Sequence, residues 1–297
     1  MLLHYLYLKE TRNNMSSFIC EAEKLIHNKN FNIYRITEIC NGKSETLKLQ
    51  YANPCQNVYS VAKVFATTAA MMLVDREMLS LDERVVDIFR DELPSDIDAK
   101  WEKTTLHHLL THRAGFSSGQ LDIDCLDSTK FGCDDYLKLL FTTPLVSEPG
   151  EKHTYSDAAF YMVSRIVSKK LGEPMDNFLW REIFTPCGFR EVAWSKCPLG
   201  YPMGATGLYI RTDDLAKLGQ IYLDGGMYNG KRILSEEAVK TVFEKGYELS
   251  WRGSYYSKGG MRGSMLQIIP SKNRVVAWTA CDDSDMSDLL YLAIDMD

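Results

Sequence analysis

The feature that most constrains this chain is the position of its strand-type segments, which occur at its two ends. Two alternating runs, 31–40 and 45–51, flank the Asn-Gly dipeptide at 41–42, which tolerates the positive φ angles of a tight hairpin turn. A second β-rich pair, 263–270 and 274–281, lies near the other end. Strands from both ends are expected to pair around a common core. The chain is therefore predicted to be α+β, with one antiparallel sheet built from both termini.

The segment between these strands is dominated by helical patterns and by loops rich in Gly and Pro. Residues 60–78 are apolar on nearly every side, as expected of a helix at the centre of a protein. Further helices are predicted over 17–27, 106–111, 136–141, 158–170, 213–223 and 286–294. We interpret residues 1–297 as a single domain, with an α/β lobe from 1–60 and 245–297 and a helical lobe from 61–244.

Composition narrows the classes of partner and compartment. The chain has 34 Lys and Arg against 40 Asp and Glu, with no basic block, which argues against a nucleic-acid partner. Its eight cysteines form no C-x-x-C pair, which favours buried thiols in a reducing compartment. The apolar segment 2–8 lacks the flanks of a signal peptide and is too short to span a bilayer. We expect a cytoplasmic protein with no membrane partner, or an exported one if a leader is missing from this sequence.

The first chemical candidate is the pair Ser60 and Lys63, which share a face at the start of the predicted buried helix. An amine in an apolar site is expected to have a lowered pKa, so that it could take the proton of a serine nucleophile. The N-terminus of the helix would favour an oxyanion beside Ser60. Ser-x-x-Lys is expected about once by chance in a chain of this length, so alone it favours a structural interpretation.

Two further motifs come later in the chain. Tyr155 follows a Pro-Gly turn at 149–150 and enters a helix, where it could shuttle a proton between nucleophile and leaving group if a nearby lysine lowers its pKa. Lys258-Gly259-Gly260 precedes the C-terminal strands. Two glycines let the backbone approach a ligand closely, although a flexible turn is the alternative interpretation.

Together and in this order, the three motifs resemble those of the serine β-lactamase and penicillin-binding protein superfamily, on its class C β-lactamase-like and D-alanyl-D-alanine carboxypeptidase-like side. In that family Ser-x-x-Lys, Tyr-x-Asn and Lys-Thr-Gly line one active site. Residues 105–116 are similar to the family's "HLLTHTSGL" segment, and 149–156, 204–219 and 229–234 also match family segments. The resemblance covers 58–280 and implies a cleft where the sheet meets the helical lobe.

The resemblance implies a role for each matching residue. Ser60 would be the acylated nucleophile, and Lys63 the general base or proton acceptor. Tyr155 would be a second base, and Lys258 would tune it and orient the substrate. The backbone N–H groups of Ser60 and Met261 would form an oxyanion hole.

No cofactor and no metal are implied by the resemblance. His108 and His112 stand four residues apart, like zinc ligands. No Glu follows His108, however, and the segment matches a structural segment of the family.

Two positions depart from the family pattern. Asp157 stands where Asn is usual; an ionised carboxylate only accepts hydrogen bonds, and it should favour the ammonium form of Lys63. Gly259 replaces the usual Thr or Ser and so removes a hydroxyl that would help to bind a carboxylate. Arg262, next in the sequence, is the candidate for a replacement cation. We predict that Asp157, Gly259, Gly260 and Arg262 contact the substrate.

These departures argue against efficient β-lactam hydrolysis more than against hydrolysis itself. The resulting hypothesis is a serine hydrolase that forms an acyl-enzyme on Ser60 with a small-molecule or peptide substrate, an ester or an amide. One alternative is a D-alanyl-D-alanine carboxypeptidase or β-lactamase. Another is a binding or sensor protein that keeps the fold without turnover, which Asp157 and Gly259 would support.

Overall fold

The computed structural model describes residues 15–296, so the apolar segment 2–8 lies outside the described residues. A six-stranded sheet has the order β2-β1-β11-β10-β9-β8, and all its neighbouring strands are antiparallel. The strands are β1 (Ile33–Cys40), β2 (Lys43–Lys48), β8 (Ser250–Trp251), β9 (Tyr256–Gly259), β10 (Met265–Ile269) and β11 (Arg274–Ala280). The predicted α+β class, with a sheet built from both ends of the chain, is confirmed.

Each predicted hairpin is present, and its turn uses residues that tolerate a left-handed backbone. Between β1 and β2, Asn41 and Gly42 have φ angles of 50° and 77°. Between β10 and β11, a short 3-10 helix, η6 (Pro270–Lys272), ends at Asn273 with φ 46°. Asn and Gly adopt this conformation at low cost, so local sequence is enough to set both turns.

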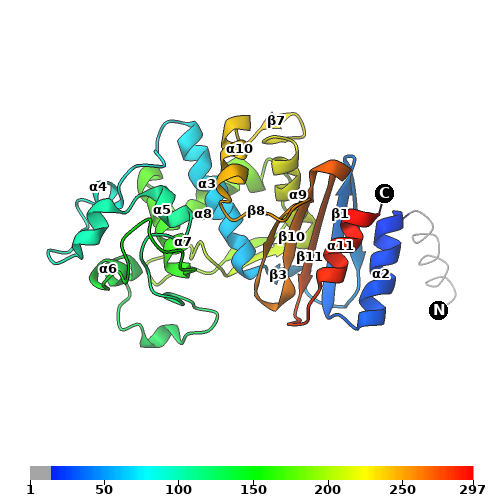
Figure 1. Cartoon of the computed structure of the whole chain (residues 1–297), viewed down its shortest axis with the longest axis horizontal. Helices are drawn as coiled ribbons and strands as arrows, with labels where there is room; N and C mark the ends of the chain where they lie inside the picture. The colour runs from blue at the N-terminus through cyan, green and yellow to red at the C-terminus, as the bar shows by residue number, and fades with distance from the viewer. Residues whose placement is uncertain (1–14, 297) are drawn as a thin grey trace.

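Helices cover the sheet on both faces, and β11 is therefore buried along its whole length. Helices α2 (Ser17–Lys29) and α11 (Ser287–Asp295) lie on the outer face, to the right in Figure 1, where they pack with Val276 and Trp278. Helix α9 (Thr212–Leu223) covers the other face. A Cβ added at Gly219 would lie 2.5 Å from Val275 Cγ1, so glycine at this position lets α9 rest directly on the sheet.

The position of α9 bears on the predicted lobes, because residues 212–223 fall within the range assigned to the helical lobe. The structure places this helix against β1, β10 and β11, on the face of the sheet that is turned towards the helical part of the molecule (Figure 1). Its hydroxyl at Thr212 lies 2.9 Å from the hydroxyl of Thr279 on β11. Helix α9 thus packs on the sheet as part of the α/β lobe. The other boundaries predicted for the two lobes stay a prediction.

The buried central helix is confirmed over a shorter range. Helix α3 (Ala62–Asp75) is buried from 62 to 73 and is preceded by a 3-10 turn, η1 (Tyr59–Val61). Helices α7 (Asp157–Leu171), α8 (Met175–Leu179) and α10 (Glu236–Lys245) surround it. The remaining helices are α4 (Val85–Ile88), α5 (Leu106–Leu110) and α6 (Tyr136–Thr142).

Short strands complete the fold. They are β3 (Cys55–Asn57), β4 (Val192–Trp194) and β5 (Leu208–Arg211) in one sheet, and β6 (Met227–Tyr228) and β7 (Lys231–Arg232) in another. Strand β3 leads directly into η1, and Val58 N donates a hydrogen bond to Leu208 O at 2.9 Å. This small sheet therefore fixes the start of the segment that carries Ser60. Within 15–296, no helix is long and apolar enough to cross a membrane.

Candidate active site

Ser60 lies in a constrained turn rather than in the first turn of an α-helix. It is the middle residue of η1, and the residue before it, Tyr59, has a left-handed backbone with φ 49°. Tyr59 N donates to Asn57 Oδ1 at 2.9 Å, which helps to hold this conformation. Such an outlier costs about 1–3 kcal/mol and occurs most often at functional sites. The turn places Ser60 on the wall of a cleft.

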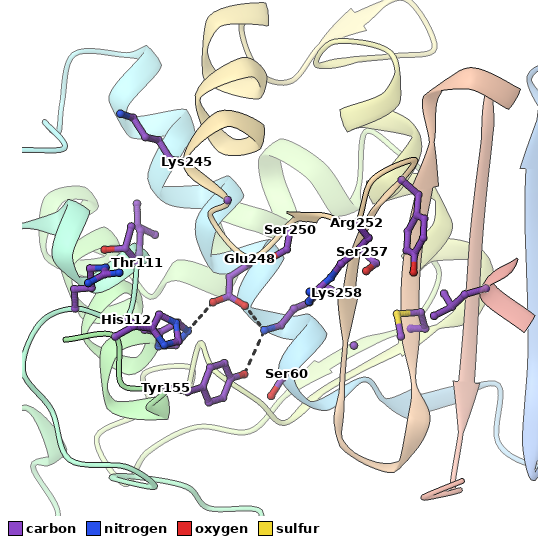
Figure 2. Close-up of a pocket in the computed structure, with 18 residues that line it drawn as sticks. Ser60, Thr111, His112, Tyr155, Lys245, Glu248, Ser250, Arg252, Ser257 and Lys258 are labelled. Atoms are coloured by element: carbon purple, nitrogen blue, oxygen red, sulfur yellow. Dashed lines mark hydrogen bonds and ion pairs between the residues drawn. The ribbon is translucent and has the colours of Figure 1, made fainter. Parts of the chain in front are cut away.

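The cleft has a volume of about 740 Å³ and lies between the sheet and the helical part of the molecule (Figure 2). Four of the predicted residues line it, namely Ser60, Tyr155, Lys258 and Gly259. Lys63 and Asp157 are buried beside it, with relative exposures of 0% and 6%. The structure thus brings the three motifs together at one cleft, although they are separated by almost 200 residues of sequence from Ser60 to Lys258.

The Lys63 ammonium group uses all three of its hydrogen-bond donors. Its Nζ donates to Ser60 Oγ at 3.2 Å, to Asp157 Oδ1 at 2.7 Å and to the backbone oxygen of Ala205 at 3.0 Å. A carboxylate and a carbonyl oxygen can only accept hydrogen bonds. Asp157 and Ala205 therefore take two N–H donors of Lys63. The ammonium form donates its third to Ser60 Oγ, whereas a neutral amine would accept the serine proton there.

The predicted lowering of the pKa of Lys63 is wrong. Burial, the largest single effect, does lower the pKa, but the electrostatic effects of Asp157, Tyr155 and Glu248 and the hydrogen bond to Asp157 outweigh it, and the net pKa is raised. The expectation that Asp157 favours the ammonium form agrees with this direction. Lys63 is therefore an ammonium group at neutral pH, and the site needs another proton acceptor for Ser60.

Tyr155 is positioned between two cationic side chains. Lys258 Nζ donates to the Tyr155 hydroxyl at 3.3 Å (Figure 2), and Lys63 Nζ lies 4.7 Å from the centroid of the tyrosine ring. An ammonium group only donates, so Lys258 leaves the proton of the Tyr155 hydroxyl available for another acceptor. Tyr155 is 42% exposed and can reach both solvent and substrate in the cleft.

Lys258 is held in place by a buried carboxylate, Glu248, with which it forms an ion pair (Figure 2). Burial by itself would raise the pKa of Glu248, but the Lys258 charge and the hydrogen bond from His112 outweigh it and lower the pKa to about 2. Glu248 therefore stays ionised over the whole physiological range. It fixes the Lys258 ammonium beside Tyr155.

His112 completes this network from the other side of the cleft. Its Nδ1 accepts a hydrogen bond from Ser156 N at 3.3 Å, so its Nε2 carries the proton and donates to Glu248 Oε1 at 2.7 Å. Burial is the main cause of its lowered pKa, and the charges of Lys63 and Lys258 act in the same direction. Its ring packs on Tyr155, with centroids 4.4 Å apart. A neutral His112 thus supports both Tyr155 and Glu248.

Gly260, the second glycine of the third motif, serves close packing within the chain. A Cβ added at Gly260 would lie 2.3 Å from Val58 O, so this end of β9 fits against the segment that precedes Ser60. Both glycines were predicted to let a ligand approach the backbone. At Gly260 it is the backbone of Val58 that makes this close approach. Met261 follows directly in the 3-10 turn η5 (Met261–Gly263), and the pairing of its N–H with that of Ser60 stays a prediction.

Arg262 does not contribute to the wall of the cleft. Its guanidinium forms an ion pair with Asp283, and its backbone oxygen accepts from Asp282 N at 3.0 Å. The residue has φ 59°, so the chain turns sharply there. The structure therefore does not place Arg262 where it would replace the missing hydroxyl of Gly259.

The two candidate zinc ligands have separate partners. His108 Nδ1 accepts from Thr105 N at 3.2 Å as part of a helix cap, whereas His112 binds Glu248. Three carboxylates, those of Asp122, Asp124 and Asp157, do approach within 4.8 Å of one another. Asp157 among them is already neutralised by Lys63, so this cluster gives no reason to assign a metal.

Sequence reasoning missed the roles of Glu248 and His112. His112 belongs to a segment that was assigned on resemblance alone, and Glu248 lies in no motif. One structural signal is shared: both have a left-handed backbone, with φ 54° at His112 and 65° at Glu248. Neither angle can be read from sequence, because both residue types usually adopt φ < 0.

Comparison with known proteins identifies the family of this chain. The Beta-lactamase family model matches residues 53–293. A curated Escherichia coli (strain K12) protein named "Putative D-alanyl-D-alanine carboxypeptidase" is 25% identical over 248 residues, covering 65% of this chain. The chain spans only 57% of the length of that relative.

Solved structures share the fold at low sequence identity. A class C β-lactamase from Rhodobacter sphaeroides is 17% identical with a TM-score of 0.67, covering 94% of this chain and 99% of its own. A hydrolase with promiscuous acyltransferase activity, EstCE1, is 15% identical with a TM-score of 0.71, covering 94% of this chain and 98% of its own. Because the family model covers most of the chain, this protein belongs to the Beta-lactamase family.

Proposed function

We propose that this protein is a serine hydrolase that forms an acyl-enzyme on Ser60 with an ester or amide substrate. The observation that carries the proposal is the cleft-lining Ser60 hydroxyl, which accepts a hydrogen bond from Lys63 at 3.2 Å, beside a Tyr155 that Lys258 holds at 3.3 Å. A buried ammonium group and a bound tyrosine have no structural necessity on a cleft wall. Together they fit an activated nucleophile.

In the first step, Ser60 Oγ attacks the substrate carbonyl carbon. The proton of Ser60 passes to the Tyr155 oxygen while the Tyr155 proton passes to the departing alcohol or amine, so that the tyrosine ends neutral. The bond between carbonyl carbon and leaving group breaks, and an ester to Ser60 remains. Lys63 donates to Ser60 Oγ throughout and offsets negative charge that develops there.

In the second step, water attacks the acyl-enzyme carbonyl. The water proton passes to Tyr155 while Tyr155 returns a proton to Ser60 Oγ, which releases the carboxylic acid and restores the enzyme. Each step moves one proton through the same side chain, so a fixed position of the Tyr155 oxygen matters more than its exposure. Lys258, held by Glu248, supplies that position.

The test is covalent labelling combined with turnover. We expect mass spectrometry to find a single adduct on Ser60 after incubation with a fluorophosphonate, and we expect 4-nitrophenyl esters to be hydrolysed. Ser60→Ala should abolish both, whereas Ser250→Ala, which alters another serine of the cleft wall, should retain the adduct. No Ser60 adduct from a fluorophosphonate, an acyl ester or a penicillin would contradict the proposal and favour a binding protein.

The substrate is proposed to be something other than a penicillin or a D-alanyl-D-alanine peptide. Gly259 has no hydroxyl to offer a carboxylate, and Asp157 is engaged by Lys63, where an Asn amide could donate. We therefore expect adduct formation with short esters to exceed that with penicillin. A penicillin that acylates Ser60 faster than the esters do would favour the carboxypeptidase or β-lactamase alternative. Cytoplasmic location stays a prediction.

A further inference from the structure

The wall of the cleft carries more positive than negative charge, although the chain as a whole has a formal charge of -6. Its Lys, Arg, Asp and Glu residues are Arg113, Lys245, Arg252, Lys258 and Glu248. The only carboxylate of this set is bound by Lys258 and His112. Three basic side chains are therefore left without a carboxylate from the wall, and they favour an anionic ligand.

Of these three, Arg252 has the position that best fits a substrate bound along the sheet. Arg252 N donates to Tyr255 O at 2.8 Å at the end of the β8–β9 hairpin, and Ser250 pairs with Ser257. Side chains alternate between the faces of a strand, so Arg252 shares one face of the sheet with Ser257 and Gly259. All three line the cleft, and Figure 2 shows Arg252 and Ser257 among its wall residues.

Arg252 is also available to a ligand. It is exposed, and within residues 15–296 no Asp or Glu forms an ion pair with it. The two other cations are less suitable: Arg113 donates to the backbone oxygen of Glu151 at 3.1 Å, and Lys245 lies at the end of α10, beyond Glu248 from Ser60 in Figure 2. Planar guanidinium groups bind carboxylates through two parallel hydrogen bonds.

The distance between Arg252 and the nucleophile limits the shape of the ligand. The Gly260 end of β9 packs on Val58, close to Ser60, whereas Arg252 lies opposite Tyr255. Tyr255 and Gly259 are four positions apart, and a strand rises by roughly 3.3 Å per residue, so their backbones lie about 13 Å apart along β9. The Arg252 backbone therefore lies at the end of β9 that is remote from Ser60, and this placement favours a ligand whose anion is separated from the reacting carbonyl group by a chain.

We propose that Arg252 is the specificity-determining residue of this cleft, and that the substrate is an ester or amide with a carboxylate remote from the reacting carbonyl. This inference rests on the proposed function of the same site. It differs from recognition of a carboxylate next to the reacting bond, because Gly259 lacks a hydroxyl there and Arg262 is paired with Asp283. Arg252 would bind the anion through its guanidinium while Ser60 reacts at the other end of the cleft.

The experiment uses pairs of substrates that differ at one carboxyl group, which is ionised in one member and methylated in the other. Each pair is a 4-nitrophenyl monoester of a dicarboxylic acid and the same compound with its free carboxyl methylated, in the succinyl, adipyl and suberyl series. We expect the ratio of kcat/KM between the anionic and the neutral member to rise with chain length. In Arg252→Met the suberyl ratio should fall at least about fivefold, mainly through KM, and Arg252→Lys should restore part of it.

Arg90→Met is the matched control, because Arg90 is highly exposed and pairs with Asp87 outside the cleft wall. Its ratio should equal that of the unaltered protein. The preference should also weaken with added salt, because Arg252 is exposed to solvent. A ratio near one in every series, or a succinyl preference that Arg252→Met leaves unchanged, would overturn the inference while leaving esterase activity intact.

A binding measurement decides the inference even without turnover. Calorimetric titration of the Ser60→Ala variant with monomethyl suberate and with dimethyl suberate reports anion binding separately from catalysis. We expect the monoanion to bind more tightly, and the difference to fall at least about fivefold when Arg252→Met is added. Equal affinities with and without Arg252 would overturn the inference. Absence of any Ser60 adduct would instead overturn the proposed function.

Discussion

Two ammonium groups flank the same tyrosine, and the difference between them shows how the cleft is built. Lys63 and Lys258 lie 4.7 Å and 4.9 Å from the centroid of the Tyr155 ring, and each has a carboxylate partner. The Lys63 side chain has no exposure, whereas that of Lys258 is 13% exposed. One pair is sealed beneath the nucleophile, and the other opens on the cleft.

The two lysines also differ in how many of their N–H donors are already bound. All three N–H donors of Lys63 are used, by Ser60, Asp157 and Ala205. The described residues account for two of the three donors of Lys258, through Glu248 and Tyr155. Lys63 therefore has a fixed structural environment, while Lys258 keeps one donor that can bind substrate. Four predictions test this contrast.

The largest effect is expected when the sealed pair is broken. Lys63→Met leaves Asp157 buried without its partner, which should lower the free energy of unfolding by about 3–5 kcal/mol and abolish turnover. Denaturant titration at neutral pH measures the stability. Lys63→Met combined with Asp157→Leu removes both charges and should recover most of the loss. A single variant as stable as the unaltered protein would show that the pair is not under this constraint.

The open pair should give a smaller effect with a distinct pH dependence. The pKa of Glu248 falls from 4.5 to about 2 on folding, so its contribution is complete above pH 4.5 and is lost as the pH falls towards 2. That shift corresponds to about 3 kcal/mol. Glu248→Gln should lose this amount at pH 7, and the difference from the unaltered protein should shrink below pH 4.5, as measured by denaturation at several pH values.

Glu244→Gln is the control for that measurement, because Glu244 is exposed and lies 3.9 Å from Lys240 at its nearest ion-pair atom. Exposed pairs of this kind contribute about 0–1 kcal/mol. A Glu248→Gln variant whose stability changes in parallel with the unaltered protein at every pH would contradict the assigned role of Glu248.

Removing the charge of Asp157 tests whether this carboxylate keeps Lys63 in its ammonium form. In Asp157→Asn the burial of Lys63 is opposed by less negative charge, so its pKa should fall. We expect acylation of Ser60 by penicillin, followed by mass spectrometry, to become up to about tenfold faster at pH 7. Asp122→Asn, which alters a neighbouring carboxylate, should give no such gain. An unchanged or slower rate in Asp157→Asn would contradict this explanation.

The smallest effect is expected at the strand beside the open pair. A Cβ at Gly259 would lie 3.3 Å from Met265 Cε, the flexible end of a side chain, so Gly259→Thr should cost less than about 1 kcal/mol of stability. The added hydroxyl should speed penicillin acylation, whereas Gly259→Ala should not. Equal acylation rates in the two variants would show that the hydroxyl is not what the cleft lacks.

Sequence alone determined the parts of the site that depend on local spacing. The spacing of three positions between Ser60 and Lys63, the hairpin at 41–42 and the strands at both ends follow from periodicity and turn chemistry, and the structure confirms each of them. The resemblance to the family motifs then predicted that Tyr155 and Lys258 line the same cleft as Ser60, as they do. Each of these inferences uses residues that lie close together in the chain, or a pattern that many chains share.

Only the tertiary structure decided the charge states of the site and the roles of residues that lie outside the three motifs. Lys63 was expected to have a lowered pKa from its apolar neighbours, but Asp157, 94 residues away, reverses the shift. Glu248 and His112 meet across 136 residues, and Arg252 rather than Arg262 faces the cleft. Coulomb energy and desolvation depend on separation and burial in space, which sequence distance does not encode.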